Sequence, residues 1–117
     1  MMIRSPKSTL RAFAAAAAGL SLVILASQAW AGDAAAGKKK ARMCVNCHGL
    51  DGMHRIPNAA NIGGETVFYL TKQLKAFRSG ERKDEQMSII AKSLSDEDIA
   101  NLAAWYSSIK ISAQIPQ

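Results

Sequence analysis

The sequence of 117 residues predicts one small all-α domain that follows a removable export signal. Three observations lead to this prediction: a short apolar segment behind basic residues at the amino end, helical spacing of apolar residues in later segments, and no segment with a strand pattern. A chain of this length holds one domain at most, which excludes multi-domain enzymes. Aromatic residues make up only 6% of it, so side chains alone would form a thin core.

The amino end has the pattern of a signal peptide. An apolar run of 15 residues, Ala12 to Ala26, follows the only charges of this segment, which are Arg4, Lys7 and Arg11. The run is shorter than the roughly 20 residues that cross a bilayer, and small residues stand where a peptidase cutting after Ala31 needs them. We expect a signal peptide over 1–31 and an exported, periplasmic domain over 32–117 without a membrane span. A cut after Ala29 and an uncleaved membrane anchor are the alternatives.

Half of the basic excess of the chain lies in this signal. The formal charge of the whole chain is +6, and removal of the three signal cations leaves about +3 on residues 32–117. No segment has a nucleic-acid-binding motif, so the charge does not indicate a nucleic-acid partner.

The domain should begin with a helix and continue with a long loop. Asp33 is a good capping residue, and alanines and lysines follow it, so the first helix is expected over 34–46. Glycine, aspartate, asparagine and proline without periodicity predict an irregular loop over 49–64. A loop of this length in a small domain usually wraps around something.

Two further helices are well marked, with a short one between them. After Thr66, apolar residues recur at steps of three and four until Gly80 offers a helix stop. These residues are Val67, Leu70, Leu74 and Phe77. A short helix is expected over 88–94, and Ser95 with Asp98 forms a capping-box pattern for the last helix, with Leu94 packed on the buried face. That face is expected to contain Ile99, Leu102, Ala103, Tyr106 and Ile109.

The most informative segment is a C-x-x-C-H pentapeptide at positions 44–48. Cys44 and Cys47 are three residues apart, so on a helical turn both thiols can add to the two vinyl groups at one edge of a haem. The imidazole of His48 would then face the iron. The sequence therefore predicts one covalently attached haem c.

Other uses of two cysteines fit less well. A thioredoxin-like redox pair opens a helix in a mixed sheet fold, and this chain shows no strands. A structural zinc site needs a second ligand pair, but only His54 follows the motif. A disulfide between Cys44 and Cys47 would be strained and would leave His48 without a role.

A second axial ligand must come from elsewhere in the chain. A thioether at this position favours ferrous iron and raises the reduction potential. Met43 lies beside the thiols, and Met53 and His54 follow His48 too closely to cross comfortably to the far face. Met87 lies after a full helix and can return over that face. We expect Met87 as this ligand, with His54 as an alternative.

With these segments in place, the chain resembles a class I cytochrome c of the small bacterial monohaem type. The resemblance covers 34–109 and is carried by segments that include 62–65, 69–82 and 94–106 around the pentapeptide. It implies a cytochrome c fold, about four helices around one haem with the terminal helices crossing. At the crossing we place Gly37 against Trp105 or Tyr106, because close helix packing needs a small residue opposite a large one.

One position departs from the family pattern. The family commonly has a proline in the loop, and the carbonyl of that proline accepts a hydrogen bond from the haem-ligating histidine. This chain has Ala60 there and Pro57 three residues earlier. The carbonyl is retained, but the loop loses a rigid constraint, and Pro57 is expected to shape a turn.

The resemblance implies a single-electron carrier and not an enzyme, because filled axial positions leave no substrate site at the iron. We expect protein redox partners, a donor and an acceptor such as a flavoprotein or terminal oxidase. A cytochrome subunit of a periplasmic dehydrogenase, such as a sulfide-oxidising flavocytochrome, is the alternative. A haem peroxidase or gas sensor would require an open sixth position. A basic docking face could comprise Lys72, Lys75, Arg78, Arg82 and Lys83, which otherwise form a solvated helix side.

Overall fold

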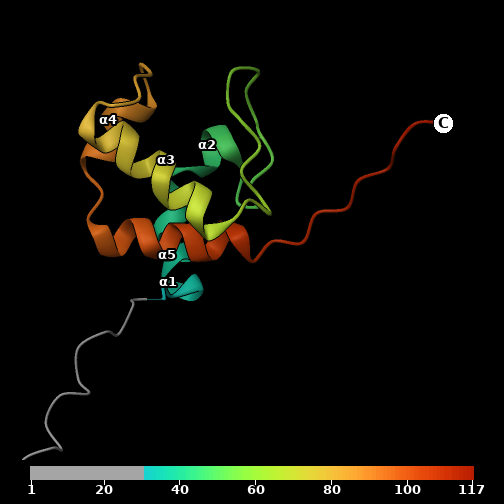
Figure 1. Ribbon diagram of the computed structural model, residues 1–117, viewed down its shortest axis with the longest axis horizontal. Coiled ribbons are helices and arrows are strands. Elements are labelled where there is room, and N and C mark those ends of the chain that lie inside the picture. Colours follow the sequence, from blue (N-terminus) through green and yellow to red (C-terminus); the bar gives the residue numbers. More distant parts are fainter. Residues whose placement is uncertain (1–30) are drawn as a thin grey trace, which may run out of the picture.

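The described residues, 31–117 of a computed structural model, form helices joined by loops (Figure 1) and include no strand, which confirms the all-α prediction. The predicted signal peptide falls outside these residues except for Ala31. In chain order the elements are α1 (Ala34–Lys40), the 3-10 turn η1 (Ala41–Met43), α2 (Val45–His48), α3 (Val67–Ser79), α4 (Met87–Lys92) and α5 (Asp96–Ser107).

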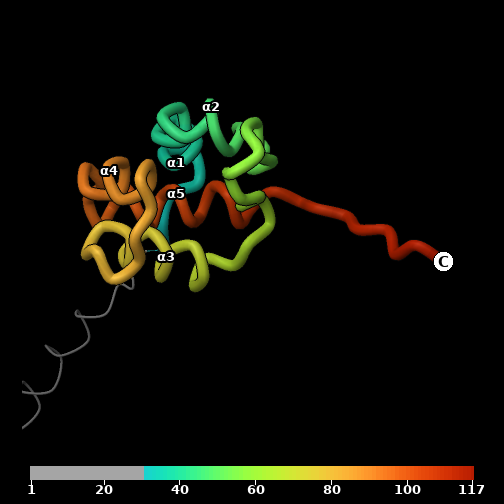
Figure 2. Tube along the Cα trace, turned by 90° about the horizontal axis from the view of Figure 1, so that it is seen from above, coloured from blue at the N-terminus to red at the C-terminus, as the bar shows by residue number. Residues whose placement is uncertain are grey.

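The last helix is the centre of the fold. Figures 1 and 2 show α5 between α1 on one side and α3 on the other, with α4 beyond one end of α3. The buried cluster is formed mainly by side chains from α5 and the segments packed on it. Its members are Ala41, Leu70, Leu94, Ile99, Leu102, Ala103 and Tyr106.

The contact between α1 and α5 depends on a glycine. Gly37 is buried, and a Cβ built on it would lie 1.9 Å from the carbonyl oxygen of Asn101 and 2.9 Å from Cβ of Trp105. No larger residue fits without moving the two backbones apart. The expected position of Gly37 against Trp105 is confirmed.

The prediction of one helix over 34–46 is wrong. Asp33 does cap α1, accepting bonds from the amides of the first turn, but the helix ends at Lys40. A 3-10 turn follows, in which the amide of Cys44 bonds to the carbonyl of Ala41 at 2.8 Å, and α2 then starts separately. Ala41 is fully buried and Lys40 pairs with Asp98 of α5 at 3.0 Å. Both tertiary contacts lie where α1 ends, whereas the helix propensity of these residues alone favours a longer helix.

Helix α3 matches its prediction at both ends. The side chain of Thr66 accepts a bond from the amide of Tyr69, and Gly80 ends the helix in the left-handed conformation with φ of 83°. Leu70 and Phe77 are buried, whereas Val67, the first apolar residue of the repeat, is 48% exposed. Val67 borders a groove between α3 and α5 where α5 contributes small side chains, Ala100 and Ala104, that cover little.

The two carboxyl-terminal helices follow the sequence closely. Helix α4 begins at Met87 and ends at Lys92, so it lies slightly earlier than the expected 88–94. The capping box of α5 forms in both directions between Ser95 and Asp98. The expected buried face is confirmed except for Ile109, which is only partly buried after the end of the helix.

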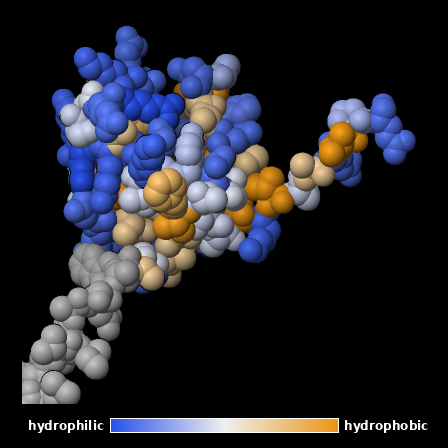
Figure 3. All heavy atoms as spheres, viewed as in Figure 1, coloured by the Kyte–Doolittle hydropathy of each residue, from blue (hydrophilic) through white to orange (hydrophobic). Residues whose placement is uncertain are grey.

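The surface is mostly polar, with apolar atoms gathered near the start of α3 and the end of α5 (Figure 3). Val67, Phe68 and Ile111 are exposed large apolar residues of these segments. Within residues 31–117, no helix is long and apolar enough to cross a membrane.

Candidate functional site

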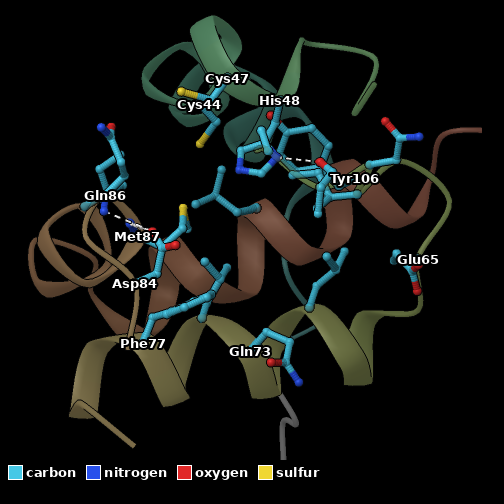
Figure 4. Close-up of a pocket in the computed structure, with 18 of the residues that line it drawn as sticks. Cys44, Cys47, His48, Glu65, Gln73, Phe77, Asp84, Gln86, Met87 and Tyr106 are labelled. Carbon is cyan, nitrogen blue, oxygen red and sulfur yellow. Dashed lines mark hydrogen bonds between the residues drawn. The ribbon is translucent and has the colours of Figure 1, made fainter. Parts of the chain in front are cut away.

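A single pocket brings together the pentapeptide, the long loop, α3 and the start of α4 (Figure 4). Its walls are mostly apolar and include Ile62, Leu70, Leu74, Phe77, Ile90, Leu94 and Leu102. All four predicted site residues line it, namely Cys44, Cys47, His48 and Met87. The loop over 49–64 encloses one side, as its length led us to expect.

The pentapeptide folds into one helical turn that is distinct from α1. The amides of Cys47 and His48 both bond to the carbonyl of Cys44, at 3.3 and 2.9 Å. Figure 4 shows both sulfurs on the same side of the pocket. The two cysteines form no disulfide with each other, and burial raises the pKa of the Cys44 thiol.

His48 is oriented by the long loop. Its Nδ1 lies 2.8 Å from the carbonyl oxygen of Ala60. A carbonyl only accepts, so Nδ1 is the donor in this bond, which leaves Nε2 as the ring nitrogen that can bind a metal. The bond therefore forms with alanine in place of the family's proline. Pro57 lies in the turn closed by the amide of Ala59 on the carbonyl of Ile56, as expected.

The loop that carries Ala60 is held by backbone contacts. The amides of Ile62 and Gly63 both donate to the carbonyl of Gly52, at 2.7 and 3.2 Å. A Cβ on Gly52, where φ is 75°, would lie 2.2 Å from the amide nitrogen of Gly63, so the two arms approach as closely as glycine permits. The amide of Arg55 donates to the carbonyl of Cys47 at 2.7 Å, which joins the loop to the pentapeptide.

Two aromatic residues of α5 hold the segment just after His48. The hydroxyl of buried Tyr106 donates to the carbonyl of Gly49 at 3.1 Å, and the indole of Trp105 donates to the carbonyl of Leu50 at 3.1 Å. Burial, and then the neighbouring Cys44, raise the pKa of Tyr106, so it stays a neutral donor. From the sequence these side chains were expected only to pack, because nothing in the sequence marks their carbonyl partners.

Met87 lies across the pocket from the cysteines and His48 (Figure 4). The carboxylate of Asp84 accepts bonds from the amides of Met87 and Gln86, at 2.8 and 2.9 Å. These two bonds lower the pKa of Asp84, so the carboxylate is ionised at neutral pH. Asp84 was not among the residues predicted from the sequence, although an aspartate shortly before a helix is a recognisable capping signal.

The remaining candidates for a second axial ligand lie elsewhere. Met43 lines the pocket, but it immediately precedes Cys44 on the same wall. Met53 and His54 do not line the pocket, and both the ring Nδ1 and the amide of His54 lie 2.8 Å from the side-chain oxygen of Asn61. Of these candidates, only Met87 approaches the pocket from the side opposite His48.

The donor set of the pocket fits a haem c. Two thiols stand side by side, an imidazole has its Nε2 available, and a thioether faces it from the opposite wall. Most of the surrounding side chains are apolar, as a porphyrin requires. In the described residues no group of three or more histidine, cysteine, aspartate or glutamate side chains could hold a bare metal ion.

Comparison with known proteins gives a consistent result. The cytochrome c family matches residues 34–110. Cytochrome c-554(548) of Halomonas halodenitrificans is 49% identical over 81 residues, which are 67% of this chain and 98% of that protein. The crystal structure of reduced recombinant cytochrome c4 from Pseudomonas stutzeri has a TM-score of 0.64 and 38% identity, over 68% of this chain and 47% of that chain.

A relative with a more specific name is the thiosulfate dehydrogenase electron acceptor of Thiomonas intermedia. It is 36% identical over 99 residues, which are 81% of this chain and 45% of that protein. The chain thus spans nearly all of the cytochrome c-554(548) but about half of these larger relatives. The chain belongs to the cytochrome c family of haem-based electron carriers, and it carries one haem c attached through Cys44 and Cys47.

Proposed function

We propose that this protein is a periplasmic single-electron carrier in which His48 and Met87 are the two axial ligands of the haem iron. The observation that carries the proposal is their placement on opposite walls of one pocket, with Nδ1 of His48 engaged by Ala60 and Nε2 free. The haem supplies one-electron cycling between ferric and ferrous iron. With both axial positions filled, the chain offers no place at the iron for a substrate, which supports a carrier and not an enzyme.

The chain's own residues have three tasks in this function. The apolar walls exclude water, and a low local dielectric raises the cost of a net charge at the centre. The bond from His48 to Ala60 holds the imidazole in its ligating tautomer. Asp84 fixes the backbone of Met87, and a thioether ligand favours the ferrous state.

Substitution of Met87 tests the axial assignment. In the oxidised holoprotein, Met87→Ala should abolish the far-red sulfur-to-iron absorption band and lower the midpoint potential. Met43→Ala, in a second methionine that lines the pocket, is the matched control and should retain the band. A band that survives Met87→Ala would refute the assignment, and its loss in His54→Ala alone would favour the alternative ligand.

We propose that residues 1–31 are a signal peptide and that 32–117 form the exported domain. The family match begins at 34, the same residue at which α1 begins. Gly32 packs tightly on α5, since a Cβ there would lie 2.0 Å from the carbonyl oxygen of Ala100. Mass spectrometry of the holoprotein from the periplasm should give Gly32 as the first residue. A mass that includes the apolar run would show an uncleaved anchor.

The partners are redox proteins, and a dehydrogenase is a specific candidate for the donor. The relative named as a thiosulfate dehydrogenase electron acceptor supports a second hypothesis, in which the cytochrome serves one oxidoreductase. Size-exclusion chromatography of native periplasm distinguishes this hypothesis from that of a freely diffusing carrier. Elution of the haem absorbance at the monomer position supports a diffusing carrier, whereas comigration with a flavoprotein or another dehydrogenase supports an enzyme subunit.

The expected basic docking face is smaller in the structure than in the sequence. Arg78 is engaged by Asp96 and by the carbonyl of Leu94, and Arg82 folds back onto α3. Lys72 and Lys75 on α3, and Lys83 after it, are exposed and continue to fit an acidic partner.

A further inference from the structure

The carbonyl that orients His48 belongs to a residue with an unrestricted backbone. Ala60 accepts the bond from Nδ1 of His48 at 2.8 Å, but an alanine lacks the ring that fixes φ in a proline. A turn holds the chain up to the amide of Ala59, and the next backbone amide that donates a bond is that of Ile62. Within residues 31–117, neither of the two amides between these points donates a hydrogen bond, so the backbone alone does not fix the carbonyl.

The side chain of Asn61 supplies an attachment at this place. Its oxygen accepts two hydrogen bonds from His54, one from the backbone amide and one from ring Nδ1, each at 2.8 Å. The backbone amide can only donate, so the atom of Asn61 that it meets is the oxygen, and that oxygen has two lone pairs for the two donors. The residue directly after Ala60 is therefore tied across the loop to a residue seven positions earlier.

His54 in turn lies in a segment that is fixed to the pentapeptide. The amide of Arg55 donates to the carbonyl of Cys47 at 2.7 Å. The guanidinium of Arg55 pairs with the carboxylate of Asp51 at 2.9 Å and donates to the carbonyl of Met53 at 3.1 Å. The amide of Met53 also donates to the carboxylate of Asp51, at 3.0 Å. These contacts on both sides of His54 make it a fixed point from which the rest of the loop can be held.

We propose that Asn61 is a positioning residue for the axial histidine. Its two bonds to His54 hold the carbonyl of Ala60 against Nδ1 of His48, which a rigid residue at position 60 would otherwise do. A hydrogen bond at Nδ1 makes the imidazole a more basic ligand and so favours ferric iron, which means that Asn61 also lowers the reduction potential. The proposal rests on the role of His48 proposed above, but it does not depend on Met87 as the second ligand.

The test is the exchange of the Nδ1 proton of His48 with solvent, followed by NMR in the reduced holoprotein. Opening of the bond to Ala60 exposes this proton, and loss of one net hydrogen bond changes an opening equilibrium by about fivefold. Asn61→Ala should therefore exchange this proton about fivefold faster than the unmodified protein. His54→Ala should have a smaller effect, because the backbone amide of residue 54 keeps its bond to Asn61.

The matched control is Asn58→Ala. It makes the same substitution in the same loop, at a side chain that forms no hydrogen bond in the described part of the chain. The exchange rate of the Nδ1 proton of His48 should stay at the value of the unmodified protein.

A rigid residue at position 60 distinguishes positioning of the carbonyl from a general loosening of the loop. Since the amide of Ala60 donates no hydrogen bond within residues 31–117, proline can occupy this position without losing one. In an Ala60→Pro background, Asn61→Ala should change the exchange rate by less than it does in the unmodified chain. The midpoint potential should rise in Asn61→Ala, and it should rise less in the proline background.

An exchange rate in Asn61→Ala equal to that of the Asn58→Ala control would overturn the proposal. An equal effect of Asn61→Ala in both backgrounds would overturn it as well. If Asn61→Ala does not assemble, His54→Ala with and without Ala60→Pro gives the same comparison. The ring current of a haem displaces the carbon-bound ring protons of an axial histidine, so the same spectra show whether His48 is a ligand. Failure of the proposed function is therefore distinguishable from failure of this proposal.

Discussion

The two sides of the pocket are held by different kinds of contact. On the His48 side, the ring bonds to a carbonyl 12 residues away, and the carbonyl of Gly49 accepts from Tyr106, 57 residues away. On the Met87 side, the amide of Met87 bonds to Asp84, three residues away, in a segment that is mostly exposed. The imidazole is thus fixed by the tertiary fold, whereas the thioether is fixed by a local turn. We expect the Met87 side to open at lower cost.

The largest effect should come from removing the group that both sides enclose. In the double variant Cys44→Ala, Cys47→Ala no haem can be attached covalently, and the buried core of residues 31–117 has only nine apolar residues. A core of this size supports little stability without a covalent staple. Thermal melting by far-UV circular dichroism should show no cooperative transition in the variant, while the holoprotein melts cooperatively. A cooperative melt of the variant would contradict the prediction.

On the His48 side, Tyr106→Phe removes one long-range bond without changing the shape of the core. The carbonyl of Gly49 loses a donor in a buried position, which should cost about 1–1.5 kcal/mol of unfolding free energy. Chemical denaturation of the holoprotein measures this loss. The far-red band should persist in the variant, because the contact lies on the opposite side from Met87. Tyr69→Phe, at an exposed tyrosine of α3, should change stability little.

On the Met87 side, Asp84→Ala should weaken binding of Met87 to the iron more than it destabilises the fold. The amides of Gln86 and Met87 lose their acceptor, but both residues are accessible to water, so the loss of unfolding free energy should be smaller than in Tyr106→Phe. The far-red band should disappear at a lower denaturant concentration than global unfolding. Glu85→Ala, at an exposed neighbour without a hydrogen bond of its side chain in the described residues, is the control. Coincident loss of band and fold would show that the two sides do not differ.

The smallest expected effect is at the start of α5, away from both ligands. The carboxylate of Asp98 accepts from the amide of Ser95 and pairs with Lys40, and these contacts lower its pKa. A lowered pKa in the folded state adds stability above the ordinary value near 3.8 and loses it as the pH falls through the folded-state value. Asp98→Asn should therefore be less stable than the unmodified protein at pH 7, by about 0.5 kcal/mol or more.

The same prediction has a pH signature. The difference between Asp98→Asn and the unmodified protein should shrink as the pH falls below 3.8, because protonation removes the same contacts from the aspartate. Glu97→Gln, next to it on α5, should show a much smaller difference at pH 7. A constant difference across the pH range would exclude the carboxylate contacts as its cause.

Much of the fold was predictable because its signals are local. Thr66, Gly80 and the pair Ser95 and Asp98 act within one helical turn, and each marks a helix end in the structure. The pentapeptide is likewise a local signal, because its two cysteines and its histidine lie within five consecutive residues. The prediction of a single helix over 34–46 was wrong. The helix breaks at Ala41, which is fully buried, and helix propensity does not include such tertiary contacts.

The candidate site shows the same difference between local signals and tertiary contacts. The sequence by itself determined which residues can bind a haem, since thiol spacing, imidazole and thioether are properties of residue type and order. Only the tertiary structure decided how they are held: the tautomer of His48 through Ala60 and the support of Gly49 by Tyr106. Each of these contacts joins a side chain to a partner that its own residue type does not specify, and packing of the helices brings the two together.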